Sequence, residues 1–339
     1  MAGKMRMRIA LAICFAILLP SPGSAWGRRG HRVIDRAALN ALPPDGPVFL
    51  QNYADWIESN AGIPDTWRSP SEPFLKIDED PNHGWFREQF AFMPDKDVPR
   101  SRYEFVLAIY NQYLKVRAKD PEGAERMNVQ WTGTLPYAAV ESYERLITGM
   151  RLLRAARAHK EDTKFLEMDC AFYVARLGHY IGDGAQPLHD TIQHDGWVGP
   201  NPQGYTLDHG IHGRFESVFV DKMQLKPEDI APRIGKFQNR ADVFDALLVY
   251  LDAAGSHVEE VYQLDKRHAF DDAADPQARE LVYAQTAAAA QMLRDLICMA
   301  WQESGTIPSP QSNPVDVRNP GYNPSTGSAP APLSRGTAQ

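Results

Sequence analysis

A chain of 339 residues, 43% of them hydrophobic, is long enough to bury a sizeable core in one large domain or two small ones. The formal net charge of −7 argues against proteins that bind duplex nucleic acid through a broad basic face, although it leaves room for a small site where metal ions meet phosphate. No stretch beyond the first 25 residues is apolar enough to span a bilayer, so we predict a protein that is not transmembrane.

The first residues have the pattern of a signal peptide. Three basic residues precede an apolar run, residues 9–19, and mostly small residues follow at 20–25. Cleavage after Ala25 would leave Trp26 as the N-terminus and move the formal net charge to −10. A membrane anchor is the alternative, but the run is short and prolines follow it. We therefore expect residues 1–25 to be removed and the protein to be exported to the periplasm or the extracellular space.

Cysteines are few. Removal of residues 1–25 would leave only Cys170 and Cys298. One disulfide and two buried free thiols are both consistent with an exported protein. Two cysteines cannot form a thiolate zinc cluster, so a metal site must use histidine and carboxylate ligands.

Helical periodicity dominates the rest of the chain, and alternating strand patterns are scarce. Pro136 and Pro276 suit the first turns of two predicted helices, where the missing N–H would have no partner. The predicted helices cover residues 32–42, 103–116, 135–158, 167–181, 241–264 and 276–303.

Two later segments lack the helical pattern. Residues 190–210 are rich in Gly, Pro, Asn and Asp, which predicts a loop between two helices. From residue 304 the chain has almost no large apolar residues, which predicts disorder. We therefore predict an all-α protein with a single helical domain at 26–303 and a disordered tail at 304–339.

The strongest chemical signal is the segment LGHYIGDGAQPLH, which contains His179, Asp183 and His189. A helix places His179 and Asp183, four residues apart, on one face, and Pro187 ends that helix so that His189 can turn back. The helix is otherwise apolar, so both titratable groups need partners. Metal coordination would supply them, and a His–Asp hydrogen bond in a helical core is the alternative.

A second pair, His212 and Glu216, repeats the four-residue spacing beyond the predicted loop. Imidazole and carboxylate ligands suit zinc, and a bridging carboxylate lets two ions lie close together. Two such pairs with His189 indicate a site for several metal ions. A surface His–Glu pair is the alternative for this pair taken alone.

The expected new N-terminus lies five residues before His31, in the segment WGRRGH. A free α-amino group has a pKa of about 7.7–8.0, so a nearby cation can deprotonate it. The nitrogen and the carbonyl oxygen of Trp26 would then chelate one ion, at a site that exists only after cleavage. A frayed terminus with an incidental histidine is the alternative.

Together these motifs resemble the superfamily of bacterial zinc-dependent phospholipase C and the fungal and plant single-strand-specific nucleases. The matching segments are WGRRGH, HYIGDGAQPLH and HGRFE, and the middle one fits the family pattern H-x-x-x-D-x-x-x-x-x-H with Q-P-L before the last histidine. The resemblance spans residues 26–303. It implies an all-helical, single-domain bundle of that type with three zinc ions in a cleft.

The resemblance also implies a ligand set. Asp183 would bridge two ions, and the second of these needs an aspartate and a histidine from between the first two motifs. Asp65 and His83 are the best matches, with Asp55, Asp78 and Asp80 as alternatives for the aspartate. The implied ligands are Trp26 (backbone nitrogen and oxygen), His31 and Asp183 for one ion; Asp65, His83, His179 and Asp183 for the second; and His189, His212 and Glu216 for the third.

The chain departs from both branches of the superfamily. The short spacing from Trp26 to His31 resembles the nucleases, whereas Glu216 resembles phospholipase C. The loop HDGWVGPN, residues 194–201, replaces the Gly-Gly-Asn of many nuclease loops. In this loop we expect His194 to be exposed to solvent, with substrate contact as the alternative.

We expect a metal-activated water to attack phosphorus, with Asp65 as the catalytic residue that orients the water or accepts its proton. The preferred function is an endonuclease on single-stranded DNA or RNA, with 3′-nucleotidase activity as an extension. Zinc-dependent phospholipase C on phospholipid headgroups is the alternative, and a non-catalytic periplasmic zinc-binding protein is the third. No stable protein partner is predicted.

Tryptophans such as Trp85 and Trp131 are expected in the core, and Trp197 is the one to test for base stacking.

Overall fold

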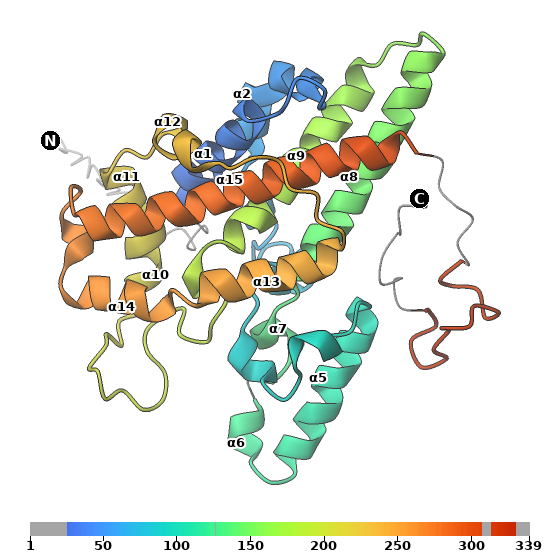
Figure 1. The fold of residues 1–339 in the computed structure, drawn as a ribbon. Coiled ribbons are helices and arrows are strands. Elements are labelled where there is room, and N and C mark those ends of the chain that lie inside the picture. The colour runs from blue at the N-terminus through green and yellow to red at the C-terminus, as the bar shows by residue number, and fades with distance from the viewer. Residues whose placement is uncertain (1–25, 126, 307–312, 330–339) are drawn as a thin grey trace, which may run out of the picture.

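The computed structural model describes residues 26–125, 127–306 and 313–329 (Figure 1). These residues form helices and connecting loops, with one isolated β-bridge between Asn323 and Ser328. The prediction of an all-α protein is therefore confirmed. The predicted signal peptide, residues 1–25, lies outside the described residues.

Six helices of thirteen residues or more frame the described part of the chain: α1 (Gly27–Asn40), α5 (Arg102–Arg117), α8 (Leu135–Ala158), α9 (Lys164–Asp183), α13 (Val243–Gly255) and α15 (Pro276–Ser304). Shorter α-helices connect them: α2 (Ala54–Asn60), α3 (Ile63–Thr66), α4 (Pro73–Glu79), α6 (Pro121–Ala124), α7 (Val129–Thr132), α10 (Ile211–Gly213), α11 (Val220–Lys222), α12 (Pro227–Ile230) and α14 (Val258–Lys266). The short 3₁₀-helices are η1 (Val48–Tyr53), η2 (Asp80–His83), η3 (Arg87–Phe90), η4 (Asp95–Asp97), η5 (Pro187–His189), η7 (Ala231–Arg233) and η8 (Ala269–Asp271), and η6 (Arg214–Phe219) is a π-helix.

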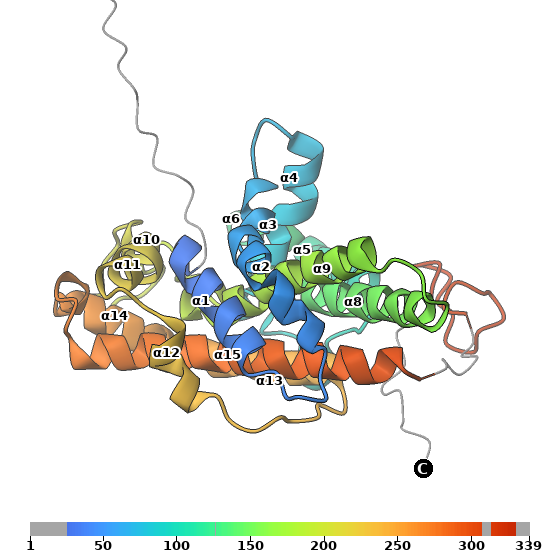
Figure 2. The same ribbon diagram turned by 90° about the horizontal axis from the view of Figure 1, so that it is seen from above.

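Helices α8 and α9 form an antiparallel hairpin, and the long helix α15 crosses it (Figures 1 and 2). Helix α1 packs against both α9 and α15, so the apolar sides of all four helices meet in one main core. A smaller apolar cluster lies where α5, α8 and α13 approach η3. This arrangement brings the start of α1 beside the end of α9, which is where the His and Asp motifs lie.

Helix α1 approaches α9 closely because α9 presents two glycines to it, one turn apart. A Cβ atom on Gly182 would lie 2.6 Å from His31 Nδ1, and one on Gly178 would lie 2.1 Å from Asp35 Oδ1. Only hydrogen fits at these two positions, so His31 and Asp35 of α1 fill the space that the glycines leave. The glycines thereby set the separation between His31 and the ligand candidates on α9.

The region from 241 to 264 departs from its prediction. It was expected to be one helix, but α13 ends at Gly255 and α14 begins at Val258. Gly255 packs close to Asp190, with a Cβ position 3.4 Å from the Asp190 Cβ atom. Gly and Ser are weak helix formers, so the chain turns at 255–257 instead of continuing.

The end of α9 also differs in detail. The helix ends at Asp183, with Gly184 as its C-cap, rather than at Pro187. Pro187 instead begins η5, the turn that carries His189 back toward the helix. The amide of Gln186 holds this turn, because its oxygen accepts a hydrogen bond of 2.7 Å from the Leu188 N–H.

Residues 313–329 form successive turns in a segment where the composition predicted disorder. The Asn323–Ser328 bridge closes these turns, and the Asn323 amide donates to Glu104 Oε1 at 3.1 Å. Short polar residues make local side-chain-to-backbone hydrogen bonds, which order a turn without an apolar core. Residues 307–312 and 330–339 of the predicted tail lie outside the described residues.

Among the described residues, no helix combines the length and the hydrophobicity that crossing a bilayer requires. Cys170 and Cys298 are both buried free thiols. Burial raises the pKa of Cys170 to about 12 and that of Cys298 to about 11, so both stay protonated at neutral pH. Of the two arrangements left open by the sequence, the free thiols are the one found.

Candidate metal centre

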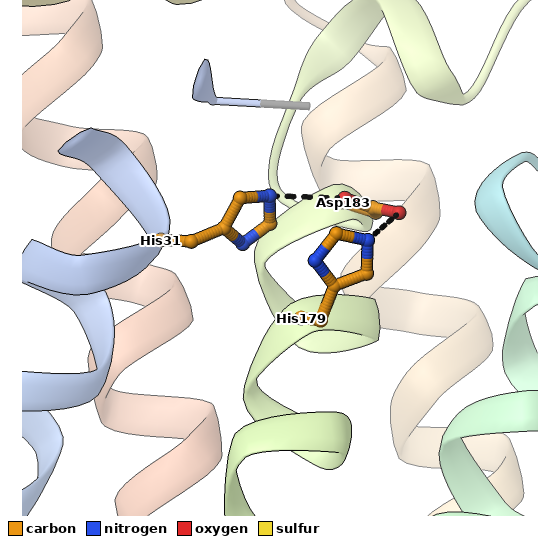
Figure 3. Close-up of side chains that lie close together, drawn as sticks. All are labelled: His31, His179 and Asp183. Atoms are coloured by element: carbon orange, nitrogen blue, oxygen red, sulfur yellow. Dashed lines mark ion pairs between the residues drawn. The ribbon is translucent and has the colours of Figure 1, made fainter. Parts of the chain in front are cut away.

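Three ligand candidates meet where α1 passes the end of α9 (Figure 3). His31 Nε2 lies 3.3 Å from Asp183 Oδ1, and His179 Nε2 lies 3.5 Å from Asp183 Oδ2. The rings of His31 and His179 stack with their centroids 4.3 Å apart. All three side chains are fully buried. The four-residue spacing on α9 thus delivers His179 and Asp183 to one point, and α1 adds His31.

Two further residues join them from the chain between the motifs. His83, at the end of η2, has its Nδ1 atom 2.9 Å from Asp183 Oδ2 and 3.2 Å from His179 Nε2. Asp65, on the short helix α3, has its Oδ1 atom 3.7 Å from His83 Nδ1 and 3.8 Å from His179 Nε2. We call His31, Asp65, His83, His179 and Asp183 the Asp183 cluster.

Asp183 occupies the middle of this cluster. Its Oδ1 atom faces His31, whereas its Oδ2 atom faces His83 and His179. His31, His179 and Asp183 form one group of atoms that could hold a metal ion, and Asp65, His83 and His179 form another. A carboxylate whose two oxygens point to different imidazoles has the geometry of a bridging ligand.

A separate group forms from η5 and the α10–η6 segment. His212 Nε2 lies 2.9 Å and His189 Nε2 lies 3.7 Å from Glu216 Oε2. Glu216 is fully buried, and its Oε2 atom also accepts a hydrogen bond from the Gln186 amide at 3.1 Å. The three ligand atoms converge closely enough to hold an ion. We call His189, His212 and Glu216 the Glu216 cluster.

Many of these converging atoms are buried without a hydrogen bond. Buried polar atoms in that position are costly, and they are satisfied in native proteins by partners or by ions. Ligand atoms that surround a common point lie close together, but they do not have the geometry of hydrogen bonds to one another. The atoms concerned are His31 Nε2, Asp65 Oδ1 and Oδ2, Asp183 Oδ1, His189 Nε2, His212 Nε2 and Glu216 Oε1.

Protonation in the Asp183 cluster reflects burial and mutual charge. Burial lowers the pKa of His179 to about 4. Burial also opposes charge on His83, but hydrogen bonds to Asp183 and Glu79 outweigh it and raise the pKa of His83 to about 9. The pKa of Asp183 is well below its usual range, because the surrounding imidazoles outweigh the burial that would raise it. A neutral His179 and an ionised Asp183 are the forms that bind cations.

In the Glu216 cluster, too, burial and neighbouring charges shift the pKa values in opposite directions. Burial would raise the pKa of Glu216, but His212 and His189 outweigh it and lower the pKa to about 2. Burial would lower the pKa of His212, but Glu216 and Asp195 raise it to about 10. The described Glu216 cluster is therefore held together by an imidazolium–carboxylate pair between His212 and Glu216.

Backbone and side-chain groups orient the histidine rings from outside the clusters. The Ala61 carbonyl accepts from His179 Nδ1 at 2.9 Å, and the His83 carbonyl accepts from His189 Nδ1. Glu79 Oε1 lies 3.2 Å from His83 Nε2 and also accepts from the Tyr180 hydroxyl at 2.6 Å. In each ring the second nitrogen is left facing the cluster. Such outer partners are characteristic of metal-binding histidines.

Two residues at the site were missed by the sequence analysis. Arg68 Nη1 lies 3.5 Å from Asp65 Oδ1, and Arg68 Nε donates to Asp80 at 3.1 Å. Glu79 was missed although it is four residues before His83, the same spacing that identified the other pairs. That spacing was the available signal for Glu79. Arg68 follows Asp65 by three residues, one helical turn, and offered no other signal.

The alternatives for the aspartate lie elsewhere. Asp55 is almost fully exposed and pairs with Arg36. Asp78 is exposed on α4, and Asp80 pairs with Lys76 and Arg68. Among these four aspartates, the one that the structure brings into the Asp183 cluster is Asp65.

Trp26 opens α1 with a left-handed backbone conformation, at φ 49°. Its side chain is fully buried and packs against Phe215, with ring centroids 5.5 Å apart. Its carbonyl oxygen accepts from the Gly30 N–H at 2.9 Å. The start of α1 therefore lies against η6, beside Phe215, the residue that precedes Glu216.

The aromatic residues differ from expectation. Trp85 is buried in the smaller core, as expected, but Trp131 is 46% exposed. Trp197 is half-buried, donates to the Pro200 carbonyl and packs against the ring of Tyr205, so it supports the loop. Trp131 therefore exposes more of its surface than Trp197 does.

Comparisons with protein-family models, with characterised proteins and with solved structures give no match. Several groups of His, Asp and Glu side chains could hold a metal ion.

Proposed function

We propose that this protein is an exported zinc-dependent phosphodiester hydrolase. The observation that carries the proposal is the position of Asp183, with one oxygen toward His31 and the other toward His83 and His179. Two cations bridged by one carboxylate are a recurrent device for hydrolysing phosphodiesters. Imidazole and carboxylate ligands without thiolates suit zinc. Together with the sequence motifs, this supports membership of the phospholipase C and nuclease superfamily.

The proposal includes three ions. We assign one to His31, Asp183 and the backbone of Trp26, a second to Asp65, His83, His179 and Asp183, and a third to the Glu216 cluster. The unsatisfied buried atoms of both clusters support this assignment, because cations would satisfy them. The Trp26 ligand requires cleavage after Ala25.

When bound, zinc ions lower the pKa of water toward neutrality and neutralise charge on a phosphate group. Asp65 is the residue to which we assign orientation of the attacking water and acceptance of its proton, because neither of its oxygens makes a hydrogen bond. Arg68, beside Asp65, offers N–H donors to phosphate oxygens. Burial of the Asp183 cluster excludes bulk water and strengthens these interactions.

Single-stranded nucleic acid is the substrate that we propose first, with 3′-nucleotides as smaller substrates. Phe86 stacks on His194, with centroids 4.9 Å apart, beside the Glu216 cluster. The exposed Trp131 lies one residue before Thr132, whose carbonyl accepts from the Phe86 N–H. Aromatic faces near a phosphate site suit the stacking of unpaired bases.

Phospholipid is the second candidate, and helix α4 favours it. Phe74 and Ile77 on α4 are 90% and 68% exposed, and the helix leads directly into η2, which carries His83. Exposed apolar side chains beside a phosphate site suit contact with a lipid surface. Helix α4 projects from the body of the molecule in Figure 2.

The Asp183→Asn variant tests the proposal, because asparagine keeps the shape but cannot bridge two cations. We expect purified Asp183→Asn protein to lose zinc, measured by mass spectrometry, and to lose hydrolysis. Asp78→Asn, an exposed aspartate of α4, is the matched control and should keep both. Full zinc content with undiminished hydrolysis in Asp183→Asn would overturn the proposal.

Substrate assays of the wild type complete the test. Activity on single-stranded DNA and RNA supports the nuclease, and activity on phosphatidylcholine vesicles supports the phospholipase. Bound zinc without activity on either would indicate the non-catalytic zinc-binding protein. N-terminal sequencing of the exported protein checks that Trp26 is the first residue.

A further inference from the structure

The loop after η5 brings two more metal-ligating side chains to the outer side of His212. Asp195 Oδ1 lies 3.4 Å from His212 Nδ1, and Asp195 Oδ2 lies 3.3 Å from His194 Nδ1. Ligand atoms of these three residues lie within 4.8 Å of one another, as those of the Glu216 cluster do. The two nitrogens of the His212 ring thus face two different ligand groups, Nε2 the inner one and Nδ1 the outer one.

We call His194, Asp195 and His212 the outer group. Its side chains are already positioned for a ligand, but the group is open to solvent. His194 is fixed by stacking on Phe86, with an interplanar angle of 17°. The Asp195 side chain is 47% exposed, whereas Glu216 of the inner group is fully buried. Imidazoles on both oxygens hold the pKa of Asp195 below its usual range, against the burial that would raise it, so the carboxylate is ionised. An open site with a charged carboxylate and two imidazoles suits a weakly held, exchangeable zinc ion.

While its ring is neutral, His212 cannot serve both groups at the same time. A neutral imidazole has one nitrogen with a free lone pair and one that carries a proton. If an ion binds Nδ1, the proton moves to Nε2, which then faces Glu216 as a donor instead of facing an ion as a ligand. The inner ion would keep only His189 and Glu216.

We propose that His194, Asp195 and His212 form an outer zinc site that competes with the Glu216 cluster for His212, so that excess zinc inhibits hydrolysis. The inhibition rests on the proposed function, whereas the outer site rests only on the geometry of these three residues. In the other interpretation, Asp195 merely orients His212 from outside, as carboxylates do for many metal-binding histidines. That interpretation requires neither His194 nor a further ion.

The test compares the wild type with His194→Ala, using Zn²⁺ alone as the probe. The full exported chain is loaded with zinc, freed of excess and titrated with Zn²⁺ in a calorimeter, while hydrolysis is followed over the same concentrations. His209→Ala is the matched control, because His209 is an exposed histidine of the same loop and belongs to neither cluster nor to the outer group.

We expect the wild type and His209→Ala to show a further, weaker binding event and a parallel fall in hydrolysis. The His194→Ala variant should lose that event and keep its activity at high zinc. The proposal is overturned if the wild type shows no further event, or if His194→Ala matches it in binding. If no variant hydrolyses any phosphodiester, the proposed function fails, and the calorimetric comparison still decides the outer site.

Discussion

Glu79 Oε1 lies 3.2 Å from His83 Nε2, and this contact turns the other ring nitrogen, Nδ1, toward Asp183. The Tyr180 hydroxyl donates to the same oxygen, so the carboxylate is held in place. A charged acceptor on one nitrogen makes the other a better ligand. Glu79 is therefore a positioning residue for the Asp183 cluster.

We expect Glu79→Gln to weaken zinc binding by about 10- to 100-fold, because the amide keeps the shape but loses the charge. The measurement is competition with a chelator of known affinity. The matched control is Glu72→Gln, at the exposed start of α4, which should bind zinc as the wild type does. Equal affinities for the two variants would contradict the role of Glu79.

Zinc binding should release protons at neutral pH. In the metal-free protein the pKa of His83 is raised to about 9 and that of His212 to about 10, so both rings carry an additional proton at pH 7. Each must lose that proton before it can bind an ion. We expect calorimetry in buffers of different ionisation enthalpy to show proton release, and zinc affinity to rise with pH. No release at pH 7 would show that these rings are already neutral.

The same groups fix the sign of the pH dependence of stability. A folded-state pKa above the unfolded value of about 6.5 adds stability that is fully present below pH 6.5 and is lost as the pH rises through the folded value. For His83 and His212 the loss falls between about pH 6.5 and 10. The melting temperature of the metal-free protein should therefore fall over this interval. A stability that stays constant or rises there would contradict the assigned pKa values.

The sequence predicted the parts of the site that lie on regular helices. His179 and Asp183 share α9, and their four-residue spacing alone placed them together. The same spacing identified His212 and Glu216, although the segment between them is a π-helix. A π-helix leaves residues four apart near each other, so the chemistry was found although the local conformation was not.

The ligand candidates between the first two motifs could not be predicted from the periodicity of the sequence. Asp65 lies on α3 and His83 at the end of η2, and both elements are four residues long. Such short turns have no periodicity, and packing against the long helices fixes their positions. Both residues were named only through the resemblance. Asp195 was missed for a similar reason, because it comes from a loop whose course depends on tertiary contacts.

Arg68 should affect turnover and not metal content. It is no ligand candidate, but its guanidinium lies 3.5 Å from Asp65, the residue to which we assign orientation of the attacking water. Removing one preorganised donor to a charged transition state costs about 10²-fold or more in rate. We expect Arg68→Ala to lose at least that much in kcat while its zinc content stays the same.

The control for Arg68→Ala is the variant Lys76→Ala. Lys76 Nζ also pairs with Asp80, at 2.7 Å, but it lies on α4. Lys76→Ala removes the other cationic partner of Asp80 and should keep its activity. Equal losses in the two variants would mean that Arg68 acts through Asp80 and not on the substrate.

Gly178 carries the last prediction, which concerns the contact of α1 with α9. An alanine Cβ at this position would lie 2.1 Å from Asp35 Oδ1 and 3.1 Å from Leu293 Cδ2, and both of these side chains are fully buried. Alanine favours a helix over glycine by about 1 kcal/mol, but overpacking a core costs about 1–3 kcal/mol, so the clash wins. We expect Gly178→Ala to lower the free energy of unfolding, measured in urea.

The Gly178→Ala variant should also bind zinc more weakly. To relieve the clash, α1 must move away from α9, and this movement takes His31 away from Asp183. The matched control is Gly213→Ala, at a helical glycine with no atom within 4 Å of the added Cβ, which should be neutral or slightly stabilising. If Gly178→Ala matched this control in both stability and zinc affinity, the spacing between α1 and α9 would not be set by the glycines. A loss of zinc affinity without a loss of stability would mean instead that α1 yields locally at His31, while the core formed with α15 remains intact.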